Sequence, residues 1–343
     1  MTFELRARGL VAALLVATTA SACGDGLTGE LSAPRQLVDH NFHPDPGSIY
    51  FADVDGGSAR RADLIAVESD DIVVQISSGS DLNPAARWSD VQFKGAMGNF
   101  FADVTGDGKA DAITSSDLAV VVRRSDGTTF LPDDANWIDG QFTGSYGLFF
   151  ADVTGDGRAD AIVSNDFGVT VRRSDGTEFL PNDPNWIEGP FTGSHGLFFA
   201  DVTGDGKADA IVVNDYPVTV RRSDGTRFLP NEGWTSDAFV GTYGTFFADV
   251  TGDGKADAIA VNDTRVTVRP ANGTPGQPNG TAFLSATTWL TTQSFLGRYG
   301  TFFVDVTGDG KADAIFLSEA GVTIFVSQGS SFSSTPAAWH VGI

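Results

Sequence analysis

One 14-residue phrase recurs along the chain and constrains the fold more than any other feature. It reads FFADVTGDGKADAI at residues 100–113, and close copies begin at residues 149, 198, 246 and 302. A degenerate copy, YFADVDGGSARRADLI, occupies residues 50–65. The first aspartates of successive copies lie 48 to 56 residues apart. A nearly fixed period of this length is typical of stacked supersecondary units that bury their apolar faces only against neighbouring units.

Each period contains four short segments with the pattern of β-strands. In the copy that begins at residue 149, β-branched and aromatic residues are enriched in residues 147–153, 159–164, 168–174 and 185–191. A Ser-Asp-Gly sequence at residues 174–176 is a strong hairpin signal between the third and fourth segments. Four antiparallel strands per period describe a β-propeller blade. The sequence therefore predicts an all-β propeller of six four-stranded blades; a seventh blade would need a segment with no recognisable repeat.

Every repeat contains one tryptophan: Trp88, Trp137, Trp186, Trp234, Trp289 and Trp339. A single large ring at the same place in every blade favours packing of one blade on the next over a stacking platform for sugars. Residues 37–42 and the chain end at residues 339–343 both offer material for one outer strand. Pairing the two ends in one blade would remove an open sheet edge, and the sequence leaves open which end supplies the strand.

We expect the N-terminal 36 residues to be a signal peptide and a flexible tether, which precede a propeller domain at residues 37–343. Residues 1–22 place two arginines before a 12-residue apolar run, which is too short to span a membrane and typical of a signal peptide. Small residues directly precede Cys23, the single cysteine, as in a bacterial lipobox. We expect lipidation of Cys23, with residues 23–36 as a flexible tether. The protein would then be a lipoprotein of the bacterial cell envelope, on its outer surface or in the periplasm, or a secreted protein if Cys23 is not lipidated.

The composition is strongly acidic. Asp and Glu number 44 against 22 Lys and Arg, which gives a formal net charge of −22. A nucleic-acid-binding protein needs a basic footprint, so this class is excluded. The chain is not a disordered acidic tail either, because 41% of its residues are hydrophobic.

Many of the aspartates fall in the repeated loop Asp-Val-Thr-Gly-Asp-Gly-(Lys/Arg)-Ala-Asp. With the first Asp as position 1, side-chain oxygens lie at positions 1, 3, 5 and 9, a backbone carbonyl is available at position 7, and the glycine at position 6 permits a sharp turn. Carboxylates about 5 Å apart repel by about 3 kcal/mol per pair at an effective dielectric of about 20. Solvated Asp-Gly turns would explain one such loop but explain five near-identical loops poorly.

The loop therefore predicts a cage of oxygen ligands for a hard cation, and Ca²⁺ tolerates its irregular geometry better than Mg²⁺. We expect about five Ca²⁺ sites. The predicted ligands are Asp103, Thr105, Asp107, Lys109 and Asp111; Asp152, Thr154, Asp156, Arg158 and Asp160; Asp201, Thr203, Asp205, Lys207 and Asp209; Asp249, Thr251, Asp253, Lys255 and Asp257; and Asp305, Thr307, Asp309, Lys311 and Asp313. The residue at position 7 of each loop contributes its carbonyl oxygen.

The loop is not an EF-hand, because no glutamate stands at position 12 and a strand rather than a helix follows. The first copy, from Asp53 to Asp63, has Gly57 at position 5 and two extra residues, so we expect its site to be weak or empty. Threonine at position 3 of the five intact loops removes one charge. The affinity should then be in the weak extracellular range, about 10⁻⁴ M or somewhat tighter.

The phrase DVTGDGxADAI preceded by Phe-Phe resembles the FG-GAP/VCBS repeat, which occurs in the calcium-binding propeller of integrin α chains, in bacterial surface proteins and in some propeller lectins. The resemblance covers residues 37–343 and implies Ca²⁺ binding by the loop aspartates between the first two strands of a blade. The Gly-Ala-Pro of integrin-type copies is absent, and residues 163–166 read Val-Ser-Asn-Asp instead. This is nearer the bacterial, lectin-like branch, so integrin-type partner binding is not implied.

Signatures of enzymes are scarce. The four histidines lack the HExxH spacing, and there is no GxSxG sequence. A non-enzymatic, calcium-stabilised surface module that binds glycans or proteins is the favoured function. The alternative is a carbohydrate-active enzyme of polysaccharide lyase or hydrolase type. Such an enzyme would need residues that break the repeat symmetry, and Asp70, Asp71, Arg298 and the histidines are the candidates.

One repeated position points to a ligand site. Between the two glycines that precede the inner strand lie Tyr146, His195, Tyr243 and Tyr299, with Met97 at the same place in another copy. An aromatic residue in a glycine loop can stack on a sugar, or it can cap the core of its blade, and the second role is favoured. If it binds sugars, equivalent sites in successive blades would suit multivalent recognition.

Overall fold

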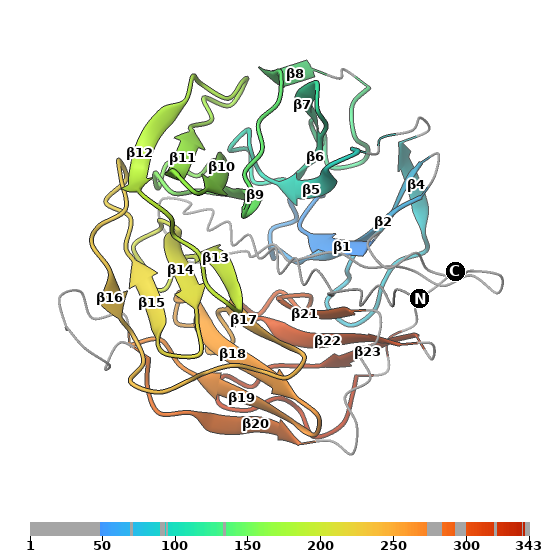
Figure 1. Cartoon of the computed structure of the whole chain (residues 1–343). Helices are drawn as coiled ribbons and strands as arrows, with labels where there is room; N and C mark the ends of the chain where they lie inside the picture. The colour runs from blue at the N-terminus through green and yellow to red at the C-terminus, as the bar shows by residue number, and fades with distance from the viewer. Residues whose placement is uncertain are drawn as a thin grey trace, which may run out of the picture.

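The computed structural model describes residues 49–339 apart from 69–70, 90–92, 94, 133–134, 273–282, 292–299, 319–320 and 338. Six antiparallel sheets are arranged in a ring as the blades of a β-propeller (Figure 1). The predicted signal peptide, the tether and Cys23 lie outside the described residues, as does Tyr299. Within the described part of the chain, no helix is long and apolar enough to span a bilayer.

Each blade follows the order of the sequence, with the first strand innermost and in contact with the first strand of the next blade. The first three blades contain β1 (Ile49–Ala52), β2 (Asp63–Val67), β3 (Ile72–Gln75) and β4 (Ala86–Ser89); β5 (Gly98–Ala102), β6 (Asp111–Ser115), β7 (Ala119–Arg123) and β8 (Ala135–Asp139); and β9 (Gly147–Ala151), β10 (Asp160–Asn165), β11 (Gly168–Arg172) and β12 (Asp183–Glu188). The last three contain β13 (Gly196–Ala200), β14 (Asp209–Val213), β15 (Val218–Arg221) and β16 (Glu232–Gly233); β17 (Gly244–Ala248), β18 (Asp257–Asn262), β19 (Arg265–Arg269) and β20 (Thr287–Thr291); and β21 (Gly300–Val304), β22 (Asp313–Ser318) and β23 (Gly321–Phe325). The prediction of a six-bladed, all-β propeller is confirmed.

The C-terminal segment lies in the outer-strand position of the sixth blade. Beyond β23, within the described residues, isolated antiparallel bridges join Ile324 to Ala337 and Ser327 to Phe332. The ring then closes between the sixth and first blades, where the rings of Phe51 and Phe302 lie 5.1 Å apart. This settles part of the question left open by the sequence, because the chain after β23 returns to pair with it. Residues 37–42, the other candidate, lie outside the described residues.

The tryptophans pack one blade on the next, as predicted. Trp137 is 4% exposed, and its ring lies 5.2 Å from that of Phe179 in the following blade. The backbone N–H of Phe179 donates to the carbonyl oxygen of Trp137. The contact recurs from blade to blade, in the pairs Trp88–Phe130, Trp186–Phe228, Trp234–Phe283 and Trp289–Phe332. Burial of aromatic surface between blades therefore holds the ring together.

Antiparallel strands in sequence order place the connections alternately on two faces of the ring. The aspartate loop between the first and second strands and the turn between the third and fourth strands lie on one face, here named the loop face. The hairpin tip between the second and third strands and the glycine loop before the next first strand lie on the other, here named the tip face. The predicted cation ligands are therefore on the opposite face from Tyr146, His195 and Tyr243, the predicted aromatic ligand residues that the structure describes.

Candidate functional site

The intact aspartate loops are organised around the carboxylate at position 1. In the second blade, Asp103 Oδ1 accepts a hydrogen bond from the N–H of Gly106 at 2.6 Å, and Oδ2 accepts one from Gly108 at 2.7 Å. The hydroxyl of Thr105 donates to Oδ1 at 3.3 Å. The glycines have φ near +80°, a conformation that L side chains rarely adopt. The same pattern surrounds Asp152, Asp201, Asp249 and Asp305.

The carboxylate at position 9 is fully buried and ties the loop to the rest of its blade. Asp111 is 0% exposed. Its Oδ2 accepts a hydrogen bond from the N–H of Val104, and its Oδ1 accepts one from Ser125 in the turn between the third and fourth strands. Equivalent bonds are made by Asp160, Asp209, Asp257 and Asp313. The donors are neutral N–H groups, so the carboxylate's charge gains no cationic partner from these bonds.

Positions 5 and 7 pair with each other at the outer edge of the loop. The Nζ atom of Lys109 lies 2.5 Å from Asp107 Oδ2, with 44% of the Asp107 side chain exposed. Arg158, Lys207, Lys255 and Lys311 pair in the same way with Asp156, Asp205, Asp253 and Asp309. The structure thus buries the predicted ligands at positions 1 and 9, whereas the position-5 carboxylate lies at the solvent side and is paired with a cation.

Burial raises the pKa of the carboxyl groups at positions 1 and 9. Desolvation raises the pKa of Asp257 to about 8 and that of Asp313 to about 7, and the nearby carboxylates of Asp249 and Asp305 add to the respective shifts. The pKa of Asp111 is raised well above its ordinary value for the same two reasons. Buried carboxylates that repel each other and receive only neutral donors are suited to a divalent cation, which would supply the missing positive charge. The donor set therefore fits Ca²⁺.

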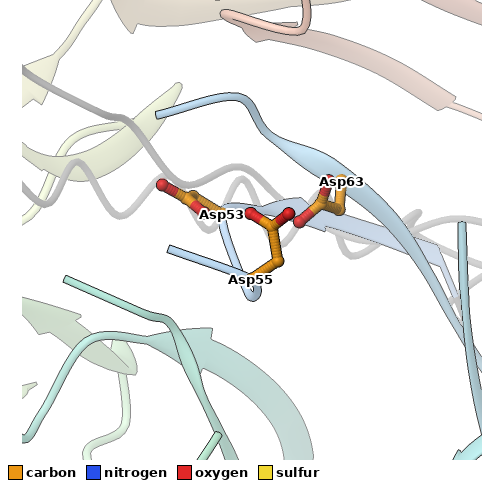
Figure 2. Close-up of side chains that lie close together, drawn as sticks. All are labelled: Asp53, Asp55 and Asp63. Atoms are coloured by element: carbon orange, nitrogen blue, oxygen red, sulfur yellow. The ribbon is translucent and has the colours of Figure 1, made fainter. Parts of the chain in front are cut away.

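The degenerate loop brings three carboxylates closest together. One oxygen each of Asp53, Asp55 and Asp63 lies within 4.8 Å of the others, and Figure 2 shows the three side chains converging. The Oδ2 atom of Asp53 is buried and has no hydrogen-bond partner. Burial raises the pKa of Asp53 to about 7. The sequence predicts a weak or empty site here, from Gly57 at position 5 and two extra residues, whereas Asp55 at position 3 supplies a third carboxylate where the intact loops carry threonine.

A ring of hydrogen bonds joins the six aspartate loops. The N–H of Ala110, at position 8, donates to the backbone carbonyl of Asp53 in the preceding blade at 2.7 Å. The same bond, also 2.7 Å long, links Ala159 to Asp103, Ala208 to Asp152, Ala256 to Asp201, Ala312 to Asp249 and Ala62 to Asp305. In five blades a serine hydroxyl adds a second link to the preceding loop, as in the 2.6 Å bond from Ser223 to the Val153 carbonyl. The loops form one connected layer.

The predicted aromatic ligand residues that the structure describes pair with aspartates on the tip face. The hydroxyl of Tyr146 donates to Asp166, and His195 Nε2 lies 2.7 Å from Asp215 Oδ1. Tyr243 is 54% exposed and hydrogen-bonds Asp263. These rings lie at the surface beside the hairpin tips, so the favoured role as caps of the blade core does not hold for them.

An ion pair that the described residues of the other blades do not repeat lies within the first blade, between Asp71, directly before β3, and Arg87 in β4. Arg87 contacts the buried Asp71 at 2.6 Å. Arg87 also lines a surface cavity of about 310 Å³ with Trp88, Ser89, Arg123, Thr129, Phe130 and Pro132. Of the residues named as candidates for catalysis, Asp71 is thus held in an ion pair, whereas Asp70, Arg298 and three of the four histidines lie outside the described residues.

Comparison with solved structures supports the fold. A lectin from Agrocybe aegerita, described for its specific recognition of non-reducing terminal N-acetylglucosamine, is 22% identical, with a TM-score of 0.61 over 96% of this chain and 91% of the lectin. The Tc holotoxin pore of Photorhabdus luminescens is 18% identical, with a TM-score of 0.59 over 91% of this chain but only 16% of the toxin chain. No curated protein is significantly similar in sequence.

The family follows from the repeats themselves. The profile of the FG-GAP-like repeat matches residues 103–163, 152–212, 201–260 and 249–316. Each match begins at the first aspartate of a loop and extends into the second strand of the following blade. Together the matches cover more than half of the chain, and they coincide with the loops and blades described above. The chain belongs to the FG-GAP-like repeat family.

Proposed function

We propose that this protein is a non-enzymatic, calcium-stabilised propeller that binds glycans on its tip face. The observation that carries the ligand assignment is the repeated pair of a surface ring and an aspartate in three consecutive blades, at Tyr146, His195 and Tyr243. A ring with a carboxylate beside it offers an apolar surface for a sugar face and strong acceptors for sugar hydroxyl groups.

In this proposal the loop face holds calcium. The residues that would bind it are the carboxylates at positions 1, 5 and 9, the threonine at position 3 and the carbonyl oxygen at position 7, as in Asp103, Asp107, Asp111, Thr105 and Lys109. The cation would neutralise carboxylates that the fold buries against neutral backbone N–H donors, as at Asp111. Because hydrogen bonds join the loops into one layer, calcium would act mainly on stability. The convergence of Asp53, Asp55 and Asp63 makes the degenerate loop a sixth candidate site.

The similarity to the Agrocybe aegerita lectin supports a glycan ligand only at the level of shared fold, because the identity is 22%. The described architecture suits that role, since equivalent surface rings recur from blade to blade and could engage several units of one polymer.

A glycan-array screen of the full chain, with calcium and with EDTA, tests the proposal. We expect binding to oligosaccharides in calcium, and we expect it to be lost in a variant with Tyr146→Ala, His195→Ala and Tyr243→Ala. Glu178→Ala combined with Arg227→Ala, which changes two exposed side chains on the loop face, is the matched control and should bind normally. Release of shortened products from a polysaccharide would overturn the non-enzymatic assignment in favour of a carbohydrate-active enzyme.

We further propose that the protein is exported and anchored to the bacterial cell envelope through a lipid on Cys23. The support is the short apolar run followed by small residues and the single cysteine. Mass spectrometry of the membrane fraction should find a diacylated N-terminal cysteine, and Cys23→Ser should release the protein from that fraction. An unmodified N-terminus at Cys23 would instead indicate secretion.

A further inference from the structure

Three hairpin tips on the tip face present large apolar side chains almost entirely to solvent. Leu118, Phe167 and Tyr216 are 81%, 90% and 67% exposed. They occupy equivalent positions, each directly after an aspartate, in the second, third and fourth blades. The fifth blade has Thr264 at the same place. The apolar tips therefore belong to consecutive blades on one part of the ring.

The fold gains little from these three side chains. Hairpin tips favour glycine, asparagine and aspartate, which tolerate the turn conformations and face solvent. A side chain that is 90% exposed, as Phe167 is, does not pack against the core. Single exposed apolar residues are normal on a protein surface, and here three different ones, Leu118, Phe167 and Tyr216, stand at one position of consecutive blades. Contact with a ligand explains the repetition.

The backbone holds two of the tips in place. The N–H of Gly140 donates to the Leu118 carbonyl at 2.7 Å, and the N–H of Gly189 donates to the Phe167 carbonyl at 3.0 Å. The Phe167 N–H also donates to the side chain of Asn165 at 2.9 Å. A side chain presented on a fixed backbone loses less conformational freedom when it binds a ligand.

Each exposed side chain has a carboxylate next to it. Asp117, Asp166 and Asp215 directly precede the three apolar residues, and none of the three tips contains lysine or arginine. Tyr146 contacts Asp166, and His195 contacts Asp215. In the third and fourth blades each tip thus combines two rings with one carboxylate.

We infer that the tip face selects glycans without negative charge, through Leu118, Phe167 and Tyr216 and the aspartates beside them. The inference rests on the proposed glycan-binding function and adds the charge class of its ligand. Neutral sugars stack on the rings and donate hydroxyl hydrogen bonds to the carboxylates, and amino sugars add an ionic attraction. Uronate and sulfate groups are repelled by the tip carboxylates and by the acidic protein as a whole, with a reach of about 8 Å at physiological salt.

Calorimetric titration of the full chain in calcium tests this selectivity with chitin, chitosan and polygalacturonate oligosaccharides of equal length. We expect the neutral and amino oligosaccharides to bind at least about tenfold more tightly than the uronate. Higher salt should reduce the advantage of chitosan and leave chitin binding unchanged. Uronate binding as tight as that of chitosan would overturn the charge selectivity while leaving glycan binding intact. No binding to any oligosaccharide would overturn the proposed function itself.

Two variants test the residues. Phe167→Ser combined with Tyr216→Ser should weaken chitin binding at least about tenfold, whereas Thr264→Ser, at the same place in the fifth blade, should not. Asp117→Asn, Asp166→Asn and Asp215→Asn together should strengthen uronate binding severalfold, because asparagine keeps an acceptor and removes the charge. Unaltered chitin binding in the serine variant would remove the tips from the ligand surface. All these side chains are exposed or at tips, so an unchanged melting temperature checks that each variant folds.

Discussion

The backbone N–H of Ala62 lies 2.7 Å from the carbonyl oxygen of Asp305 and joins the first aspartate loop to the last. The two residues are far apart in sequence, and their bond completes the set of six that links every loop to the next. The loop face is therefore a continuous layer in which a backbone hydrogen bond joins each loop to the next.

Removal of calcium should destabilise the whole ring. A ligand that binds only the folded state stabilises it by mass action, and about 1 mM calcium at sites with Kd of about 10⁻⁴ M contributes about 1.4 kcal/mol per site. Over five or six sites, EDTA should lower the melting temperature by about 10 °C or more. Differential scanning calorimetry with EDTA and then with excess calcium measures the loss and its recovery. An unchanged melting temperature in EDTA would contradict the calcium assignment.

The stability of the calcium-free protein should fall as the pH rises. Burial raises the pKa of Asp257 to about 8 and that of Asp313 to about 7, from an ordinary value of 3.8. The folded state therefore binds the protons of these two carboxyl groups more tightly than the unfolded state does. This proton binding stabilises the folded state fully below about pH 4, and the stabilisation is lost as the pH rises through about 7 to 8. Urea denaturation in EDTA should show a lower midpoint at about pH 8 than at about pH 5.

Calcium should reverse this trend, since it binds the ionised carboxylates. The stabilisation by calcium should therefore grow between about pH 5 and pH 8, and binding at about pH 6 should release protons. A calcium effect that is independent of pH would show that these buried carboxyl groups are not the ligands.

The number of calcium ions bound distinguishes two expectations for the degenerate loop. The sequence predicts a weak or empty site there, whereas the convergence of Asp53, Asp55 and Asp63 favours binding. We expect six ions per chain by equilibrium dialysis, and five in Asp55→Asn. Asp107→Asn, in an intact loop, is the positive control and should also lose one ion, because position 5 is a proposed ligand. If the unaltered protein and Asp55→Asn both bind five ions, the degenerate loop holds no calcium, as the sequence predicts.

A missing hydroxyl in the fifth blade offers a stabilising substitution. Ala271 stands where the other blades have the serine whose hydroxyl bonds to the preceding loop. Its backbone N–H donates to Asp257 at 2.7 Å, just as the N–H of Ser223 donates to Asp209 in the fourth blade. Ala271→Ser should add a hydrogen bond to the carbonyl of Val202 and raise the free energy of unfolding by about 1 kcal/mol.

The reverse substitution is the control. Ser223→Ala removes the 2.6 Å bond to the Val153 carbonyl and should lower the free energy of unfolding by about 1–3 kcal/mol, because it leaves a buried acceptor without its partner. Urea denaturation in calcium measures both variants. A loss of stability in Ala271→Ser would show that the fifth blade has no room for the hydroxyl.

The architecture could be predicted because the repeat is local in sequence: the period, the strand pattern and the Ser-Asp-Gly turns each lie within one blade. The pairing of Ile324 with Ala337 could not be predicted, because the sequence around Trp339 and that of residues 37–42 fit the outer strand equally well. Residue type and spacing predict the candidate calcium ligands of each loop, and their coordination of an ion stays a prediction. The pairing of Lys109 with Asp107 was missed, since the position-7 residue was considered only for its carbonyl.

The exposed tip residues were missed for a different reason. Leu118, Phe167 and Tyr216 each follow an aspartate, which is typical of a turn, and a turn by itself predicts no ligand contact. The signal was present in the sequence, because a large apolar residue at the tip of a tight hairpin contradicts the usual preference for small and polar residues. Only the exposed fractions show that these side chains have no place in the core.

The glycine at position 4 of each intact loop lies close to a side chain of the following blade, so the residue tolerated there depends on the next repeat. A Cβ added to Gly106 would lie 2.8 Å from the side chain of Arg158, which belongs to the following blade, and Gly155 and Gly252 meet Lys207 and Lys311 in the same way. A new side chain at such a glycine would need a matching change one blade away. Successive copies are thus restrained from diverging independently, which gives a physical reason for near-identical loops within one chain. At the ring closure the neighbouring loop is the degenerate one, which has two extra residues, and there Gly308 meets Ala59 and Arg61 instead of the position-7 side chain of an intact loop.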